Sequence, residues 1–134
     1  MNMIPDSHRD LVGENSKAIA YLATTLPDGA PVISPVWFGI INEQIAVYSG
    51  ASSLKAKNMR AQPQVSLVLQ DPDNVYRYVQ IRGRYVKSIS EGARDFLDEA
   101  SRRYIGKDYP TSTSGDGVIL LIQPEKVNVF EWDA

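Results

Sequence analysis

Short runs of apolar residues, separated by turn residues, make up the first half of the chain. The runs at 17–26, 30–41 and 44–50 are rich in β-branched and aromatic residues, which is typical of strands. The turns PDG at 27–29 and NE at 42–43 separate them. Strands joined by such short turns predict two hairpins in succession, and therefore an antiparallel meander.

The second half of the chain carries further strand-like runs. They lie at 63–70, 75–89, 118–124 and 126–132, and the turn DPDN at 71–74 joins the first two. Gly83 stands inside the long run 75–89. A glycine in the middle of a strand predicts a bulge or the close approach of another backbone.

The long run 75–89 also alternates, so it predicts one buried and one exposed face. Its odd positions are apolar except for Arg77 and are expected to be buried: Val75, Val79, Ile81 and Tyr85. Its even positions pass from aromatic to basic: Tyr76, Tyr78, Gln80, Arg82 and Arg84. Such a face could contact the bases of a single-stranded nucleic acid, line a ligand cleft, form a subunit interface or simply face solvent.

The stretches expected to be helical are residues 5–14, 54–61 and 90–106. Ser52 or Ser53 can cap the second helix. In the third, Ser90 can cap the start and Gly106 ends the helix. Its apolar residues recur at helical spacing and form one face: Phe96, Leu97, Ala100 and Tyr104.

These elements predict an α+β fold that is mainly β, in which six or seven antiparallel strands form a barrel flanked by helices. Closing so short a sheet on itself removes its exposed edges. No repeat or low-complexity segment divides the 134 residues, so a single domain spanning 1–134 is expected.

The composition is that of an ordinary globular protein, with 43% hydrophobic and 22% charged residues and a formal net charge of −2. No apolar run approaches the roughly 18 residues of a membrane span, and the first residues lack the features of a secretory signal. Cysteine is absent, which excludes disulfides, thiolate metal sites and cysteine nucleophiles. A cytoplasmic protein without a membrane partner is therefore expected.

Histidine occurs once, at His8, where it is expected to be a solvated residue of the first helix. The sequence has no G-x-S-x-G motif and no set of zinc ligands. Hydrolytic and metal mechanisms are therefore disfavoured. If the chain is an enzyme, a bound organic cofactor is expected to carry the chemistry.

The stretch SSLKAKNMR at 52–60 is basic, although the chain as a whole is acidic. At about 100° per residue, Ser53, Lys57 and Arg60 share one face of the expected helix. Lys55 lies nearly opposite, close to the helix start. Together with the free N–H groups of the first turn, these side chains form a candidate site for an anion such as a terminal phosphate. The alternative is a set of solvated charges on a surface helix.

The stretch ISPVWFG at 33–39 is a second candidate. Pro35 removes a ladder donor, so it should lie at a sheet edge or a bulge. A distorted strand beside Trp37 would expose backbone groups to which a flat heterocycle could hydrogen-bond. The alternative is that Trp37 belongs to the core and Pro35 only ends a strand.

The order of these segments resembles a known superfamily. TTLPDGAPVISPVWFGI, AVYSGASSLKAKNMRAQPQVSLVLQDP and YVQIRGRYV follow one another as in the pyridoxamine 5′-phosphate oxidase-like split β-barrel proteins. Within that superfamily the likeness is to the small flavin- and deazaflavin-dependent oxidoreductases. It covers roughly residues 15–132, and its most specific elements are SPVWF, the basic block with its asparagine and the later R-G.

The resemblance implies a homodimer with two cofactor sites at the subunit interface, each holding FMN or the deazaflavin F420. Lys55 and Lys57 would hold the cofactor phosphate, and the other residues of the implied site are Ser34, Pro35, Val36, Trp37, Tyr48, Ser49, Ser53, Asn58, Arg60, Arg82 and Trp132. Of these, Pro35, Val36 and Trp37 would run beside the ring, and Tyr48 and Ser49 would border the phosphate tail. The implied reaction is hydride transfer with a small conjugated or quinone-like substrate. Pyridoxine phosphate is not expected, because the chain ends at VNVFEWDA without the arginine-bearing segment of the oxidases proper.

The sequence leaves the choice between FMN and F420 open, because both carry a phosphate at the same end of the ribityl chain. The longer anionic tail of F420 would need further basic groups, for which Arg77 or Arg84 are candidates. Two other functions stay as alternatives: a non-catalytic barrel that stores flavin or haem, and a module for single-stranded nucleic acid. The overall acidity argues against nucleic acid as a partner.

Overall fold

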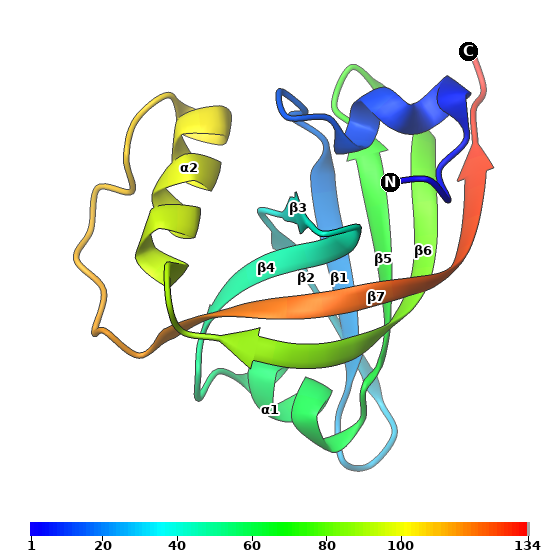
Figure 1. Ribbon diagram of the computed structural model, residues 1–134. Helices are drawn as coiled ribbons and strands as arrows, with labels where there is room; N and C mark the ends of the chain where they lie inside the picture. The colour runs from blue at the N-terminus through cyan, green and yellow to red at the C-terminus, as the bar shows by residue number, and fades with distance from the viewer. Residues whose placement is uncertain (134) are drawn as a thin grey trace.

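The computed structural model describes residues 1–133 and contains one seven-stranded antiparallel sheet with short flanking helices (Figure 1). Residue 134, the last of the predicted domain, lies outside the described residues. The strands are β1 (Ile19–Thr25), β2 (Pro31–Val36), β3 (Gly39–Ile41), β4 (Gln44–Gly50), β5 (Gln64–Asp71), β6 (Asn74–Ile89) and β7 (Gly117–Phe130). The helices are the 3₁₀ helix η1 (Asp6–Val12), α1 (Leu54–Ala61) and α2 (Ala93–Ile105).

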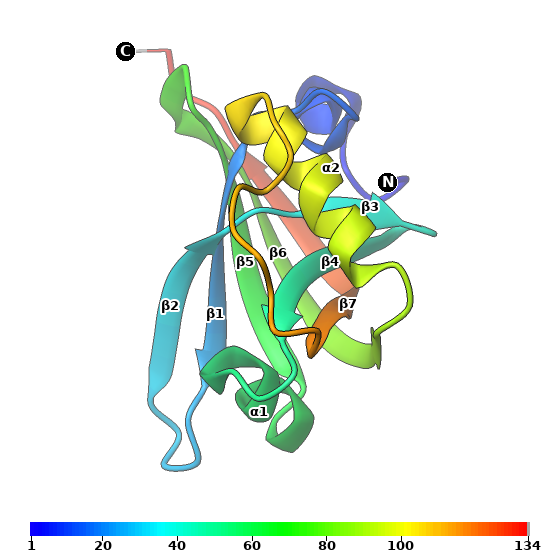
Figure 2. The ribbon, with the colours of Figure 1, turned by 90° about the vertical axis from the view of Figure 1, so that its left-hand side faces the viewer.

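The strands pair in the order β2-β1-β5-β6-β7-β4-β3, so β2 and β3 are the two edges. The long strands β6 and β7 bend strongly, and the sheet curls around its core instead of lying flat (Figures 1 and 2). The predicted fold class is therefore confirmed: the chain is mainly β, with an antiparallel split barrel and flanking helices. Two finer expectations are wrong. The sheet does not close on itself, because β2 and β3 remain as edges, and the two hairpins lie at opposite edges of the sheet instead of forming one meander. None of the helices in residues 1–133 is long and apolar enough to cross a membrane.

Two predicted strand boundaries are wrong. The run 30–41 is not one strand, because β2 pairs with β1 and β3 pairs with β4 at the other edge of the sheet. Conversely, the runs 118–124 and 126–132 form one continuous strand, β7. Pro124 is tolerated inside it because it lies opposite Gly83, where the β6–β7 register shifts.

Gly83 itself behaves as predicted, since it marks both a bulge and a close backbone approach. A Cβ atom at this position would lie 2.6 Å from the carbonyl oxygen of Gln123 and 2.9 Å from a side-chain carbon of Ile122. No side chain fits there without moving β7.

The two faces of β6 follow the predicted alternation in the middle of the strand. Val79 and Ile81 are fully buried, while Gln80 and Arg82 are exposed. Tyr85 is half-buried against the core. The prediction for Val75 is wrong: its side chain is 53% exposed, because the β5–β6 hairpin extends beyond the core.

The helices differ from the predictions mainly at their starts. Ser53 caps α1, as one of the two candidates, and its hydroxyl accepts a hydrogen bond from the Ala56 N–H at 3.2 Å. The α2 helix begins at Ala93 behind Gly92, not at Ser90, and Gly106 ends it with φ of 78°. The expected helix 5–14 is the shorter 3₁₀ helix η1.

His8 is not solvated, so that prediction is wrong as well. Its side chain is buried at 3% exposure; Nδ1 shares a hydrogen bond with the Ser7 hydroxyl at 2.7 Å, and Nε2 contacts the carbonyl oxygen of Phe130 at 2.9 Å. The imidazole thus ties η1 to the end of β7, where Figure 1 shows the N-terminal segment across one end of the sheet.

Candidate functional site

The predicted basic cluster lies on α1, which is fixed to the sheet through its polar residues. Asn58 is buried, and its amide donates to the Thr24 hydroxyl of β1 at 3.1 Å. The hydroxyls of Ser49, at the end of β4, and Ser53 share a hydrogen bond. Gln62 donates to the carbonyl oxygen of Leu26 at 3.0 Å. These bonds hold the whole length of the helix beside the ends of β1 and β4.

The cations of this helix form no ion pair with a carboxylate of residues 1–133. Arg60 donates from Nη2 to the carbonyl oxygen of Ala51 at 2.9 Å, so its guanidinium lies by the turn that precedes the helix. Lys55 is half-buried and Lys57 is exposed. Within residues 1–133, neither lysine nor Arg60 has a carboxylate partner at ion-pair distance. The cluster can therefore bind an anion without first breaking an ion pair.

Most other arginines are paired. Those that form ion pairs with carboxylates are Arg9, Arg77, Arg84, Arg94 and Arg102. Among the described residues, the arginines without such a pair are Arg60, Arg82 and Arg103. Two of these three, Arg60 and Arg82, are predicted site residues. The ion pairs of the other arginines thus leave the charges of Arg60 and Arg82 available at the predicted site.

The two arginines considered for an anionic cofactor tail are engaged elsewhere. Arg77 bonds the carboxylates of Asp10 and Asp71, and the hydrogen bond to Asp10 raises the pKa of this guanidinium above its usual range. Arg84 lies 3.5 Å from a carboxylate oxygen of Glu125. Neither guanidinium is available to a ligand unless it gives up its present partner.

The SPVW segment lies on the edge strand β2, which has a partner on one side only. Pro35 is exposed opposite Tyr21 of β1, as expected for a proline at a sheet edge. Trp37 follows the strand and is half-buried outside the sheet. Its ring stacks on Tyr104 of α2 with centroids 5.6 Å apart, and it meets Tyr109 edge-on at 6.2 Å.

The remaining predicted residues are spread over the sheet. Tyr48 packs its ring against Gly117, where a Cβ atom would lie 2.3 Å from the hydroxyl. Arg82 lines an open groove of about 540 Å³ together with Lys126. Trp132 is 54% exposed and packs edge-on against Tyr76 at 5.0 Å. Figure 1 shows that the C-terminal end of β7 and α1 lie at opposite ends of the sheet.

One chain therefore does not bring the whole predicted site together. Ser49, Ser53, Asn58 and Arg60 form one unit at α1, while Trp37 and Trp132 lie in two other places. Sequence reasoning missed Thr24, Tyr104, Tyr109 and Arg103 as neighbours of these residues. The helical spacing predicted that Tyr104 lies on the apolar face of its helix. No local sequence pattern predicted that Trp37 would contact it.

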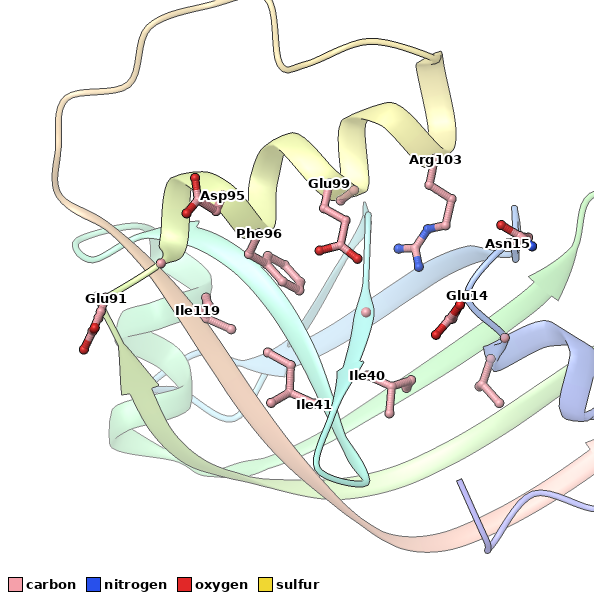
Figure 3. A pocket seen from close by; sticks show the side chains of 15 residues that line it. Glu14, Asn15, Ile40, Ile41, Glu91, Asp95, Phe96, Glu99, Arg103 and Ile119 are labelled. Carbon is pink, nitrogen blue, oxygen red and sulfur yellow. The ribbon is translucent and has the colours of Figure 1, made fainter.

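A larger cavity, of about 680 Å³, lies elsewhere, between α2 and the edge strand β3 (Figure 3). Its floor is apolar and includes Ile40, Ile41, Phe96 and Ile119. Its rim carries the carboxylates of Glu14, Glu91, Asp95 and Glu99 and the guanidinium of Arg103, which donates to the Phe38 carbonyl oxygen. Four carboxylates against one bound guanidinium repel an anion, so this cleft does not fit a phosphate-bearing cofactor.

Comparison with protein families covers nearly the whole chain. The family model described as pyridoxamine 5′-phosphate oxidase matches residues 4–131. This chain belongs to the pyridoxamine 5′-phosphate oxidase family. The match runs from η1 to the end of β7 and confirms the resemblance drawn from SPVWF, the basic block and the later R-G.

Solved structures with a similar fold include proteins of different descriptions. An F420 reductase is 28% identical with a TM-score of 0.82, and the alignment covers 93% of this chain and 98% of that chain. A conserved hypothetical protein from Mycobacterium tuberculosis is 24% identical with a TM-score of 0.71, covering 96% and 85%. An FAD-binding protein from Mesorhizobium loti is 20% identical with a TM-score of 0.67, covering 94% of each chain. At these identities, the last two similarities show the fold alone. A comparison with curated proteins finds no match.

Proposed function

We propose that this chain is an oxidoreductase that binds F420 and transfers a hydride between that cofactor and a small organic acceptor. One observation carries the proposal: Lys55, Lys57 and Arg60 lie on a helix fixed beside β1 and β4, and none of them has a carboxylate partner within residues 1–133. A cluster of free cations at a helix start is suited to a phosphate.

The residues at α1 offer a phosphate three kinds of contact. The ammonium groups of Lys55 and Lys57 supply charge, Arg60 supplies a planar donor beside the turn, and the first turn of α1 supplies N–H groups. FMN would satisfy the same cluster. The likeness to an F420 reductase at 28% identity over nearly the full length of both chains favours F420.

F420, when bound, supplies a two-electron hydride carrier. In the reductive direction the acceptor would gain that hydride together with one proton from water, and the proton set free on oxidation of the cofactor would pass to water. The chain's own part is to hold the phosphate at α1 and to present the edge strand with Pro35 and Val36 to the ring. Positioning of this kind, and not a side-chain acid or base, is the catalytic contribution expected of the protein.

The proposed assembly is a homodimer. Trp132 and Tyr76 lie at the far end of the sheet from α1, so a second copy must supply them if they complete a cofactor site (Figure 1). The outer face of the sheet also carries large exposed apolar side chains, among them Ile33 at 68% and Phe130 at 47% exposure. Light scattering coupled to size exclusion measures the mass directly, and a monomer would remove the interface site from the proposal.

A cofactor titration tests the proposed function. The purified chain is titrated with F420 and with FMN, and Lys55→Ala and Lys57→Ala are compared with the parent. Each loss of a charged phosphate contact is expected to weaken F420 binding about tenfold or more. Lys17→Ala is the matched control, since Lys17 is exposed near the start of β1, at the other end of the sheet from α1.

The outcomes separate the candidate functions. Binding of F420 with turnover of an acceptor supports the proposal, and tighter binding of FMN changes the cofactor but not the site. A cofactor that binds and cannot be cycled by any reductant or acceptor indicates a storage protein. If neither cofactor binds at micromolar concentration, the proposal is wrong.

A further inference from the structure

The cleft between α2 and β3 has the features of a second ligand site, separate from the anion site at α1. Its volume of about 680 Å³ is usual for a site that encloses a small organic molecule. Figure 3 shows the side chains of Phe96, Glu99 and Arg103 reaching from α2 into the cleft. Ile40 and Ile41 of β3 lie opposite them. The cleft thus combines an apolar floor with a charged rim.

The carboxylates of the rim have no cation in direct contact. Within residues 1–133, none of the four forms an ion pair: Glu14, Glu91, Asp95 and Glu99. Asp95 and Glu99 are four residues apart on α2, so two like charges share one face of the helix and repel each other. A bound cation would relieve that repulsion.

Arg103 is in position to pair with Glu99, because it follows four residues later on the same helix. It donates instead to the Phe38 carbonyl oxygen, and its guanidinium carbon lies 5.6 Å from the centroid of the Phe38 ring. Its Nε atom is buried and has no hydrogen-bond acceptor among the described residues. Polar groups left without partners around one cavity are more typical of a ligand site than of a purely structural contact.

The floor of the cleft restricts which cations fit. Ile40, Ile41 and Phe96 are half-buried, so a hydrated inorganic ion would leave these apolar side chains uncovered. In the part of the chain that the structure describes, no three His, Cys, Asp or Glu side chains lie close enough together to hold a metal ion. A cation with an apolar body suits both parts of the cleft. Its body covers the floor, and its charge is attracted by the rim carboxylates and by the ring of Phe96.

We infer that this cleft binds a small organic cation with an apolar body, of the arylalkylamine class, with Glu99 and Phe96 as its main contacts. The rim carboxylates repel an anion of the same shape. The inference goes beyond the function proposed for α1 and does not depend on it, because none of the residues that line the cleft belongs to the predicted cofactor site.

A set of probes that share one apolar body tests the inference. Phenylbutylamine is a cation, phenylbutanol is neutral and phenylbutyrate is an anion, and binding of each to the purified chain is measured by ligand-observed NMR without any flavin. We expect phenylbutylamine to bind at least about fivefold more tightly than phenylbutanol, and phenylbutyrate to bind more weakly than either. Butylamine, which lacks the phenyl ring, is expected to bind at least about tenfold more weakly than phenylbutylamine, because it covers less of the apolar floor.

Variants of the rim locate the binding. Asp95→Asn and Glu99→Gln change exposed side chains to neutral ones of the same size, so a chain carrying both is expected to fold. It should bind phenylbutylamine about fivefold or more weakly than the parent and phenylbutanol equally well. Asp28→Asn is the matched control. It removes a charge from the β1–β2 turn, beside α1 (Figure 1), and its amide keeps the oxygen that accepts from the Ala30 N–H.

Equal affinity for phenylbutylamine and phenylbutyrate overturns the inference, and so does unchanged amine binding in the double variant. An equal loss of amine binding in Asp28→Asn also overturns it, because the attraction would then come from the overall negative charge. If oligolysine binds in place of the amine and the double variant abolishes that binding, the occupant is a basic segment of another protein and not a small molecule. Failure of amine binding leaves the cofactor proposal untouched, since the titration with F420 is measured separately and depends on Lys55 and Lys57.

Discussion

Asn58 shows how a residue in a predicted binding motif can serve the fold. The resemblance implied that it helps to hold the cofactor phosphate, yet its side chain is 3% exposed and its amide donates to the Thr24 hydroxyl. A buried amide that bridges α1 and β1 positions the helix and leaves little surface for a ligand. We therefore interpret Asn58 as a positioning residue for Lys55 and Lys57.

Asn58→Ala is expected to lower the free energy of unfolding by about 1–3 kcal/mol, because it leaves the buried Thr24 hydroxyl without its partner. Thr24→Val is the complementary change. If the two groups act through their mutual hydrogen bond, the double variant loses less free energy of unfolding than the two single variants lose together. Urea unfolding measures both. A loss of cofactor affinity in Asn58→Ala at unchanged stability would instead indicate direct contact with the ligand.

Gly83 was predictable as a special position from sequence alone, and the structure supplies the reason. Gly83→Ala places a methyl group 2.6 Å from the Gln123 carbonyl oxygen and is expected to destabilise the chain by about 1–3 kcal/mol. Gly13→Ala is the control, since its Cβ atom has 3.5 Å to the nearest neighbour and its φ of −74° suits alanine. The midpoint of thermal unfolding should lie clearly lower for Gly83→Ala than for Gly13→Ala. Equal midpoints would mean that β7 moves aside at little cost.

At the scale of elements, prediction succeeded where the pattern is local. The α1 helix and the alternating middle of β6 were placed correctly because helical spacing and period-two alternation are properties of a short stretch. The break between β2 and β3 was missed because it depends on distant partners: β2 pairs with β1 and β3 with β4. His8 was missed for the same reason, since its partner Phe130 lies 122 residues away in sequence.

The same limit applies to the candidate site. The cations of α1 were identifiable because residue type and spacing define them, whereas the contact between Trp37 and Tyr104 joins β2 to α2. Which carboxylates remain unpaired is also a property of the folded chain. Sequence alone thus indicated the candidate phosphate-binding helix but not the contact between Trp37 and Tyr104.

Docking of η1 on the sheet should depend on pH through Asp10. The hydrogen bond from Arg77 lowers the pKa of Asp10 below the usual value of an aspartate, so the folded state favours the ionised carboxylate. The stabilisation is present above that value and is lost as the pH falls through the lower pKa of the folded state. Because the carboxylate is 66% exposed, the contribution is expected to stay below about 1 kcal/mol.

Asp10→Asn removes this dependence, so its urea midpoint should fall less than that of the parent between about pH 5 and pH 2. Asp73→Asn, at an exposed position of the β5–β6 turn, is the control and should keep the parent's profile. Identical profiles for all three proteins would show that the bond between Asp10 and Arg77 does not contribute to stability.

At the scale of the whole molecule, the basic cluster of α1 and the acidic cleft under α2 lie in different places. The unpaired cations of α1 lie beside the ends of β1 and β4, while the carboxylates of Glu14, Glu91, Asp95 and Glu99 gather at the cleft under α2. This cleft and the candidate anion site are therefore different places. Cavity size alone would favour the cleft for an anionic cofactor, whereas electrostatics favours α1.

Neutralising the cleft distinguishes these two locations. If F420 binds at α1, Glu99→Gln leaves its affinity within about twofold of the parent, because charges more than about 8–10 Å apart are largely screened at physiological salt. If F420 instead occupied the cleft, removing one repelling carboxylate would tighten binding several-fold. Raising the ionic strength should weaken binding in the first case, since it screens the attraction of Lys55, Lys57 and Arg60, and should strengthen it in the second. Titrations of parent and variant at low and high salt therefore distinguish the two locations by two results: the effect of Glu99→Gln on F420 affinity and the direction in which salt changes that affinity. Neither measurement requires knowledge of the acceptor.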